Sequence, residues 1–533
     1  MKKVTDFFKK IAKWTSAHKT AFALIMTALF VAIHIPLLLN HEITVDEGTS
    51  WQLSQEITPS NIYDINSAEP HPLLWQIILA PFSKLNFPVI TLNIISLVLV
   101  ASAVFLMFRF SPINNISKFI FMFSCALFYF LPIISRDYSL VPLAICLIGL
   151  TYKKRHEKPF LYGLSIAFLS QTHFLMYGLV AALSLGYVIE LTFKKLNVLK
   201  LLKTLALFSL PILVSIASVV PIVTNSMNNQ AVITGKYSEN TPEDDRIPFI
   251  PVTIYNFFGQ YNDTLGFVFI ASFIILFISF LSKNPKTSLY LFAGIGLWYY
   301  VLKNIYTAYA FIPPKIPLLL LMPILIIWLN LIEEEDKSKE NLIHKIFGHS
   351  ELVKVVRMKT KDSIYIILTT ILALSTIPHA FTFAIDDLNR PFSNAKEISG
   401  FINEKVEPGS LIIEGDTAAL LRSAVISNIT NDVTIYNNIL GRVEQHMDYL
   451  KYDNETIDRN RAFKGLTDEE LEKRFEELSK EYEHVYYLAY SPSCTDTARD
   501  NNNVVNKYER VAVFNDRQYL DIGRSRVSMY KIK

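Results

Sequence analysis

Six acidic residues and no Lys or Arg lie within the thirty residues 40–69, a density that draws attention to proton chemistry. Thr44 and Glu47 have the spacing of a capping box, T-V-D-E, which predicts a short helix and gives Glu47 a structural task. Asp46 has no such task, so it is our candidate general base. The alternative is an ordinary acidic loop. The six acids are Glu42, Asp46, Glu47, Glu56, Asp64 and Glu69.

The sequence Glu69-Pro70-His71-Pro72 ends this acidic segment. Two prolines restrict the backbone around His71, and Pro72 suits the first turn of a helix. The prolines by themselves are explained if the acidic loop ends and a helix begins at this point. A carboxylate and an imidazole held beside them also fit a preorganised polar site, so Glu69 and His71 are candidate substrate-binding residues.

Further polar residues interrupt apolar runs. Arg136 with Tyr138 lies in S-R-D-Y-S-L, where the guanidinium either grips a phosphate or is neutralised by Asp137. His173 lies in Q-T-H-F and is either a packing residue or part of a site. Lys303 either adds positive charge to a site or extends to the membrane interface.

Composition shows which elements must position these residues. Of the 533 residues, 51% are hydrophobic and 19% are charged, against about 25% charged in average soluble proteins. A wholly soluble, disulfide-rich or disordered protein is thereby excluded. The net charge of +3 does not indicate nucleic-acid binding, and three cysteines form no metal or disulfide pattern. Eleven apolar runs predict membrane spans near 20–39, 88–108, 118–134, 138–152, 160–176, 177–193, 204–223, 263–282, 287–302, 313–332 and 363–384.

The segment 71–85 is apolar but short and is interrupted by Pro72, Pro81 and Lys84. If it does not cross, the basic loops fall on the cytoplasmic side, as the positive-inside rule requires. We therefore expect 71–85 to lie at the outer interface, the N-terminus to be cytoplasmic and the C-terminus to be outside. All candidate site residues then share the outer side, where a polar loop over 225–262 is expected to act as a lid.

Residues 385–533 differ from residues 1–384, the expected transmembrane domain, because charge rises and long apolar runs end. Short β-like runs alternate with helix-like stretches, which predicts a small α/β domain outside the cytoplasm. The expected strands are 411–414, 433–436, 485–490, 510–514 and 527–532, and the expected helices are 394–405 and 467–482.

Acids for proton abstraction, an arginine for phosphate and a groove among apolar spans favour a lipid-phosphate substrate. Residues 1 to about 330 resemble the membrane-embedded C-type glycosyltransferases (GT-C fold), specifically the family-39-like protein O-mannosyltransferases and aminoarabinose transferases. The resemblance rests on Asp46-Glu47, on E-P-H-P-L-L from Glu69, on R-x-Y-S-L from Arg136 and on T-H-F from Thr172.

The resemblance implies an inverting transfer of a sugar from a polyprenyl-phosphate donor to a glycan, lipid or protein acceptor at the outer membrane face. It implies that Asp46 is the general base, that Glu47, Glu69 and His71 shape the substrate site, and that Arg136 contacts the donor phosphate. It implies no metal or other cofactor. Relatives often carry an Arg-Tyr pair where this chain reads Tyr309-Ala310-Phe311, a departure that concerns a second phosphate contact.

Two other classes compete with this interpretation. A flippase or transporter of lipid-linked glycans would also need an intramembrane groove, but it would favour inverted repeats and mid-membrane charges. A glycan polymerase or ligase using a diphosphate lipid would favour more outer arginines than Arg136 and Arg246.

Overall fold

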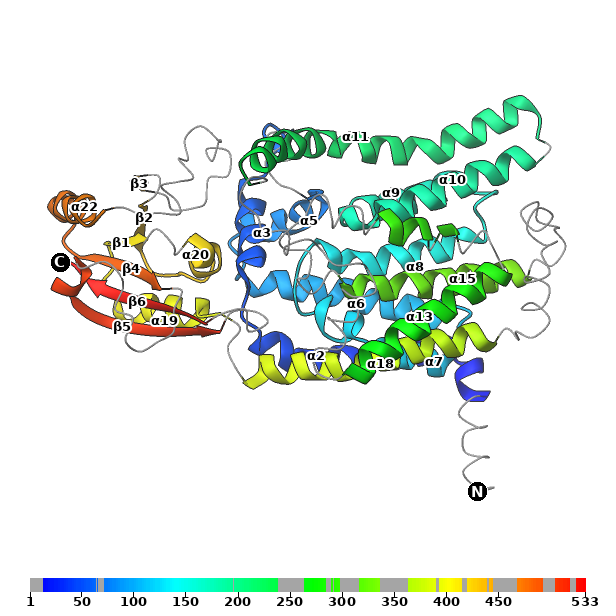
Figure 1. Cartoon of the computed structure of the whole chain (residues 1–533), viewed down its shortest axis with the longest axis horizontal. Coiled ribbons are helices and arrows are strands. Elements are labelled where there is room, and N and C mark those ends of the chain that lie inside the picture. Colours follow the sequence, from blue (N-terminus) through cyan, green and yellow to red (C-terminus); the bar gives the residue numbers. More distant parts are fainter. Residues whose placement is uncertain are drawn as a thin grey trace, which may run out of the picture. The chain divides into compact units, whose positions relative to one another are not determined.

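The structure is a computed structural model in which the chain is mostly helical, with one small mixed sheet near the C-terminus (Figure 1). It describes residues 13–63, 65, 71–194, 196–237, 263–283, 289–290, 292–297, 316–335, 363–389, 393–414, 419–438, 441–443, 467–491, 504–517 and 524–533. The chain divides into two compact units. Unit 1 comprises residues 1–36, 69–74 and 95–384, and unit 2 comprises residues 37–68, 75–94 and 385–533.

Five helices in the described ranges are long and apolar enough to cross a membrane. These candidate spans are Lys19–Asn40 (α2), Ile90–Phe110 (α6), Phe174–Phe193, Val198–Pro221 and Ile366–Asn389. The third contains the 3-10 helix η3 (Phe174–Met176) and α10 (Tyr177–Phe193), and the last two belong to α11 (Val198–Tyr237) and α18 (Ser363–Asn389). They agree with five of the expected runs.

Other apolar runs form further helices. Three are short: α8 (Val141–Tyr152) after the 3-10 helix η2 (Asp137–Leu140), α9 (Pro159–Ser170), and α15 (Leu321–Glu335) after η5 (Ile316–Leu320). The fourth, α13 (Asp263–Lys283), has 21 residues. The expected run 118–134 is divided into α7 (Asn115–Met122) and a π-helical turn, η1 (Ala126–Phe130). Half of the expected run 287–302 lies outside the described residues.

One expected boundary is wrong. The polar loop predicted over 225–262 is helical up to Tyr237, where α11 ends, and the remainder lies outside the described residues. Polarity was a poor guide here because a helix satisfies its backbone through its own hydrogen bonds whatever its side chains. Segment 71–85 contains α5 (Leu74–Lys84), whose eleven residues are too few for the roughly 20 needed to span a bilayer core.

Small residues bring the helices of unit 1 close together. A side chain at Gly163 of α9 would overlap the carbonyl oxygen of Phe208 in α11, and one at Gly149 of α8 would lie 2.7 Å from the indole ring of Trp328 in α15. Without a hydrophobic driving force between helices in lipid, such close backbone packing is a principal source of association. The neighbouring ribbons α8, α9 and α10 can be followed in Figure 1.

Unit 2 contains a six-stranded sheet in the order β3-β2-β1-β4-β6-β5. β1 pairs in parallel with β2 and β4, whereas β3, β6 and β5 are antiparallel to their neighbours. The five predicted strands are confirmed, and β3 was not predicted. The bounds are Ser410–Glu414 (β1), Val433–Asn437 (β2), Arg442–Val443 (β3), Val485–Ser491 (β4), Glu509–Arg517 (β5) and Arg524–Lys531 (β6).

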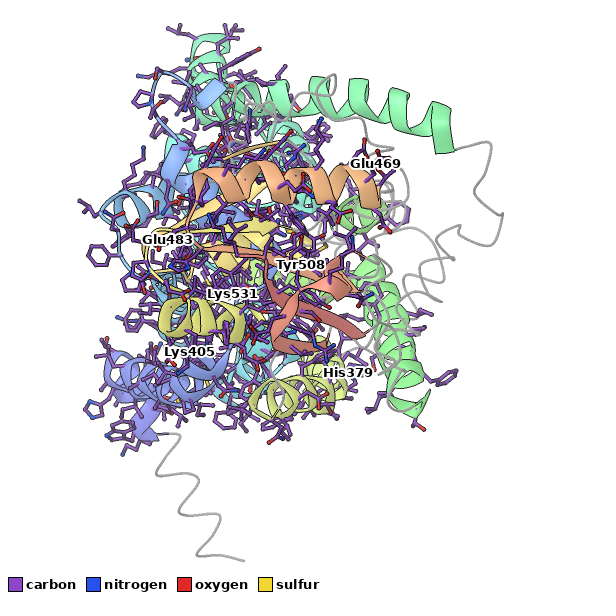
Figure 2. All side chains as sticks on the ribbon, turned by 90° about the vertical axis from the view of Figure 1, so that its left-hand side faces the viewer. His379, Lys405, Glu469, Glu483, Tyr508 and Lys531 are labelled. Atoms are coloured by element: carbon purple, nitrogen blue, oxygen red, sulfur yellow. The ribbon has the colours of Figure 1, made fainter. Side chains whose placement is uncertain are left out.

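Helices cover the sheet. The predicted helices are present as α19 (Ala395–Lys405) and α22 (Asp468–Glu481), and the short 3-10 helix η7 (Val505–Lys507) precedes β5. A capping box of Thr467 and Glu470 begins α22, and its apolar stripe of Leu471, Phe475 and Leu478 packs in the sheet core. Figure 2 draws the side chains on this domain and labels Lys531 of β6.

An unpredicted helix, α20 (Ala419–Ile426), packs within unit 2 against α3 (Val45–Glu56), the helix that bears Asp46 and Glu47. Gln52 of α3 donates to the carbonyl oxygen of Ser423 at 3.2 Å. Gly48 faces the same turn so closely that a Cβ would lie 2.6 Å from the backbone nitrogen of Ala424. The C-terminal domain therefore holds the helix of the candidate acids directly.

Gly48→Ala is expected to destabilise this contact, because backbone atoms of α20 cannot move aside as a flexible side chain could. Overpacking of this kind typically costs about 1–3 kcal/mol. Thermal unfolding of the purified protein and proteolysis between α3 and the sheet domain measure the effect. Gly400→Ala in α19 is the matched control, since nothing lies within 4 Å of its added Cβ and alanine favours a helix. Equal stability of Gly48→Ala and wild type would contradict the packing.

Candidate functional site

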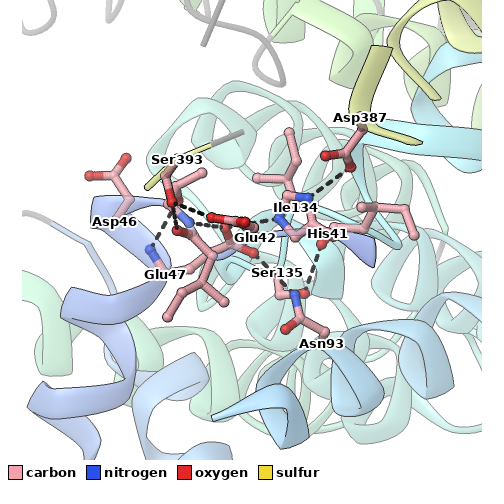
Figure 3. A network of polar contacts seen from close by, with 12 residues as sticks. His41, Glu42, Asp46, Glu47, Asn93, Ile134, Ser135, Asp387 and Ser393 are labelled. Carbon is pink, nitrogen blue, oxygen red and sulfur yellow. Dashed lines mark hydrogen bonds and ion pairs between the residues drawn. The ribbon is translucent and has the colours of Figure 1, made fainter. Parts of the chain in front are cut away.

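Glu47 is the centre of a buried polar network in unit 2 (Figure 3). Its Oε2 atom accepts from the backbone N–H of Thr44 at 2.7 Å, while its own N–H donates to Thr44 Oγ1 at 3.2 Å. Asn93 of α6 donates to Oε1 at 3.3 Å. The predicted capping box is thus confirmed, and the Glu47 carboxylate is also held by a side chain of α6.

His41 connects Glu47 to the end of α18. Its Nε2 lies 3.3 Å from Glu47 Oε2, and its Nδ1 lies 2.9 Å from Asp387 Oδ2. Burial by itself lowers the pKa of His41, but the two carboxylates outweigh burial and raise it to about 10. The ring is therefore an imidazolium shared by two buried acids. Lys396 donates to the His41 carbonyl oxygen at 2.7 Å, which adds a second cation beside them.

Asp46 differs from its neighbour in both position and surroundings. It lies in the first turn of α3 and is exposed, whereas Glu47 is fully buried. Figure 3 shows its carboxylate pointing away from the network around Glu47. Of the two adjacent acids, Asp46 is therefore the one whose carboxylate can meet a molecule outside the protein.

Unit 1 brings together four predicted substrate-binding residues from three distant segments. The rings of His71 and His173 have centroids 5.2 Å apart, and the rings of Tyr138 and His173 have centroids 6.1 Å apart. The guanidinium carbon of Arg136 lies 6.0 Å from the centroid of Tyr138. The three rings are buried and Arg136 is half-buried, so this group is a compact polar patch within apolar helices.

Serine hydroxyls fix the turn that carries Arg136 and Tyr138. Ser139 donates to the carbonyl oxygen of Leu131 at 2.7 Å, and Ser96 of α6 donates to the Ser139 hydroxyl at 2.8 Å. The backbone N–H of Ser139 donates to the Arg136 carbonyl oxygen at 2.9 Å, which begins η2. The three site residues 136–138 therefore stand on a turn with little freedom to move.

The turn that carries His173 is fixed in a similar way. Gln171 donates to the carbonyl oxygen and hydroxyl of Ser215 in α11, at 3.0 and 2.7 Å. Thr172 donates to the carbonyl oxygen of Leu169 at 2.7 Å. His173 caps η3, because its Nδ1 accepts from the backbone N–H of Leu175 at 3.1 Å. The ring is thereby oriented by its own chain.

The remaining predicted residues, Glu69 and Lys303, lie outside the described residues. Sequence reasoning missed His41, Asn93 and Asp387, which hold Glu47. It gave Asp137 only the role of neutralising Arg136, whereas Asp137 is 2% exposed and lies beside His71 and His173. The position of His41, directly after the first expected span, could have marked it as a candidate. Its partner Asp387, however, lies 346 residues away in the chain.

No protein-family model and no curated protein sequence matches this chain. Inferences about its function therefore rest on the residues and their geometry.

The His41 network predicts a pH-dependent stability. Because folding raises the pKa of His41 from its ordinary 6.5 to about 10, its contribution is complete below about pH 6.5 and is lost as pH rises through 10. Thermal unfolding of wild type and His41→Gln between pH 6 and 11 measures it. The stability advantage of wild type should shrink towards the alkaline end.

His18→Gln is the control for this comparison, since His18 is exposed. It should follow wild type at every pH. A constant difference between wild type and His41→Gln across the whole range would show that the ring is not a paired imidazolium.

Proposed function

We propose that the protein is an inverting glycosyltransferase that moves a sugar from a polyprenyl-phosphate donor to an acceptor at the outer face of a membrane. The observation that carries the proposal is the group in unit 1: His71, Arg136, Tyr138 and His173 come from three separate segments and meet among apolar helices. Such a patch offers a cation and hydrogen-bonding rings for a phosphate headgroup, and apolar surroundings for an isoprenoid chain.

Arg136 is assigned to the donor phosphate. A guanidinium stays charged in an apolar setting and can form two parallel hydrogen bonds to phosphate oxygens. The sugar–phosphate bond breaks with negative charge developing on the leaving phosphate, so a fixed cation stabilises that step. Tyr138 holds the guanidinium over its ring at the outer limit of a cation–π contact.

Asp46 is assigned to the acceptor. An acceptor hydroxyl becomes a useful nucleophile when its proton is removed as the new C–O bond forms. A single displacement by that hydroxyl inverts the anomeric centre and needs no covalent enzyme intermediate. The exposure of Asp46 and the engagement of Glu47 in four contacts support this division of roles.

The arrangement in the membrane belongs to the proposal as well. We propose eleven spans, a cytoplasmic N-terminus, and an extracytoplasmic domain over 385–533 that takes part in acceptor recognition. The packing of α20 on α3 supports this role for the domain, because it joins the domain to the helix that bears Asp46.

A direct test uses purified protein in nanodiscs with a panel of synthetic polyprenyl-phosphate sugars and cell-envelope extract as the acceptor. Mass spectrometry should detect release of polyprenyl phosphate together with a sugar-bearing product. Translocation of an intact lipid-linked glycan without bond cleavage would instead identify a flippase. Turnover with diphosphate donors alone would identify a polymerase or ligase.

Arg136→Ala should weaken donor binding by roughly 10- to 100-fold, the loss of one charge-assisted contact of about 1.5–3 kcal/mol. Arg136→Lys should recover only part of it, because an ammonium lacks the planar fork. Titration with a fluorescent polyprenyl-phosphate sugar measures both. The matched control is Arg109→Ala, since Arg109 also stacks on an aromatic ring, 4.7 Å from the Phe110 centroid. Unchanged donor affinity in Arg136→Ala would remove the phosphate role.

Asp46→Asn should reduce turnover by about 10²–10⁴-fold while leaving donor binding and protein yield near wild type, since it removes the base and preserves size. Glu56→Gln, at the other end of α3, is the control for neutralising an acid on the same helix. Steady-state turnover with a defined donor is the measurement. A near-wild-type rate for Asp46→Asn would exclude Asp46 as the base.

A further inference from the structure

Two imidazoles and one carboxylate converge within the polar group of unit 1. His71, Asp137 and His173 each offer one ligand atom, and the three atoms lie within 4.8 Å of one another. The residues are 8%, 2% and 0% exposed. His71 precedes α5, Asp137 begins η2 and His173 caps η3, so three separate breaks in the helical structure supply one atom each.

We propose that His71, Asp137 and His173 bind a divalent transition-metal ion, of which Zn²⁺ fits best. Imidazole nitrogen with one carboxylate oxygen is a common ligand set for zinc, whereas Mg²⁺ and Ca²⁺ prefer oxygen ligands alone. Zinc bonds of about 2.0–2.2 Å in a tetrahedron place ligand atoms about 3.3 Å apart. The three groups therefore need to close by no more than about 1.5 Å.

Three protein ligands leave one tetrahedral position open. Zinc sites of this kind take water or a substrate oxygen at that position. Arg136 directly precedes Asp137 on the fixed turn, so an anionic oxygen at the ion would lie in a region of positive charge. That oxygen would belong to the donor phosphate, a role that rests on the proposed function, whereas binding of the ion does not.

Binding of the ion would change the hydrogen bonding of the turn that carries His173. Its Nδ1 accepts from the backbone N–H of Leu175. If Nδ1 binds the ion, its lone pair is no longer available. If Nε2 binds, the neutral ring carries its proton on Nδ1, which then faces another N–H group. In either case ion binding breaks the cap of η3.

Metal analysis of the purified full-length protein tests the proposal without any sugar donor. Protein stripped with a chelator and reloaded with Zn²⁺ alone should retain about one equivalent after desalting. His71→Gln, Asp137→Asn and His173→Gln should each weaken binding by more than the ~10–100-fold typical of outer-shell changes. His156→Gln is the matched control, because His156 lies 2.7 Å from a carboxylate oxygen of Glu190 in a different polar cluster and should bind zinc as wild type does.

Two further readouts remain informative if a variant folds poorly. X-ray absorption at the zinc edge of wild type should show nitrogen and oxygen neighbours at about 2.0–2.2 Å with scattering from two imidazoles, and no sulfur at about 2.3 Å. Hydrogen exchange of the peptide over 173–176 should accelerate on loading, as the η3 cap opens.

Retention of no stoichiometric Zn²⁺, Mn²⁺ or Fe²⁺ by wild type would overturn the proposal. So would a sulfur-containing shell, or equal zinc affinity in wild type and all three variants. Zinc binding without glycosyl transfer would keep the metal site and reject the proposed function. Transfer by the chelator-stripped protein would keep the proposed function and exclude a role of the ion at the donor phosphate.

Discussion

A bilayer offers no water to the backbone groups that are left unpaired where a helix is interrupted, so each break must be satisfied from within the protein. This constraint accounts for the design of unit 1. The breaks before α8 and α10 are closed by Ser96, Ser139, Thr172 and Gln171, which bond carbonyl oxygens and hydroxyls of neighbouring turns. The same breaks carry Arg136, Asp137, Tyr138 and His173. Side chains capable of chemistry therefore stand on rigid turns.

Burial of charge imposes a parallel requirement in unit 2. Two carboxylates buried near each other would be costly unless a cation lay between them, and the His41 ring supplies it. Removing one member would leave an uncompensated charge. The network therefore fixes the end of α2, the start of α3 and the end of α18 relative to one another. Glu47 is committed to this structural task, which leaves the exposed Asp46 as the chemically accessible acid of the pair.

The contact between α3 and α20 gives the C-terminal domain more than a peripheral place. Through Gly48 and Gln52, the helix of the candidate acids lies against the backbone of α20. The sheet beyond α20 is stabilised by its own core, including the stripe of α22. This packing supports the proposed part of the domain in acceptor recognition.

The sequence by itself predicted the long apolar helices typical of a membrane protein, the capping box at Thr44 and Glu47, and five of the six strands of the C-terminal sheet. These features depend on local patterns. A long apolar helix shows in the hydropathy of about 20 residues, a strand in the alternation of about five, and a capping box in two residues three positions apart. It also predicted Arg136, Tyr138, His71 and His173 as site residues, because polar groups are costly in apolar runs wherever the runs finally pack.

Only the tertiary structure decided which of these residues meet. The pairing of His41 with Asp387 and the convergence of His71, Asp137 and His173 join positions far apart along the chain. Spacing in the sequence carries no information about such contacts, because they depend on how separate helices pack. The same holds for α20, a short helix whose place is fixed by contact with α3, and for the true end of α11, since a polar segment and a loop look alike until the backbone bonds are seen.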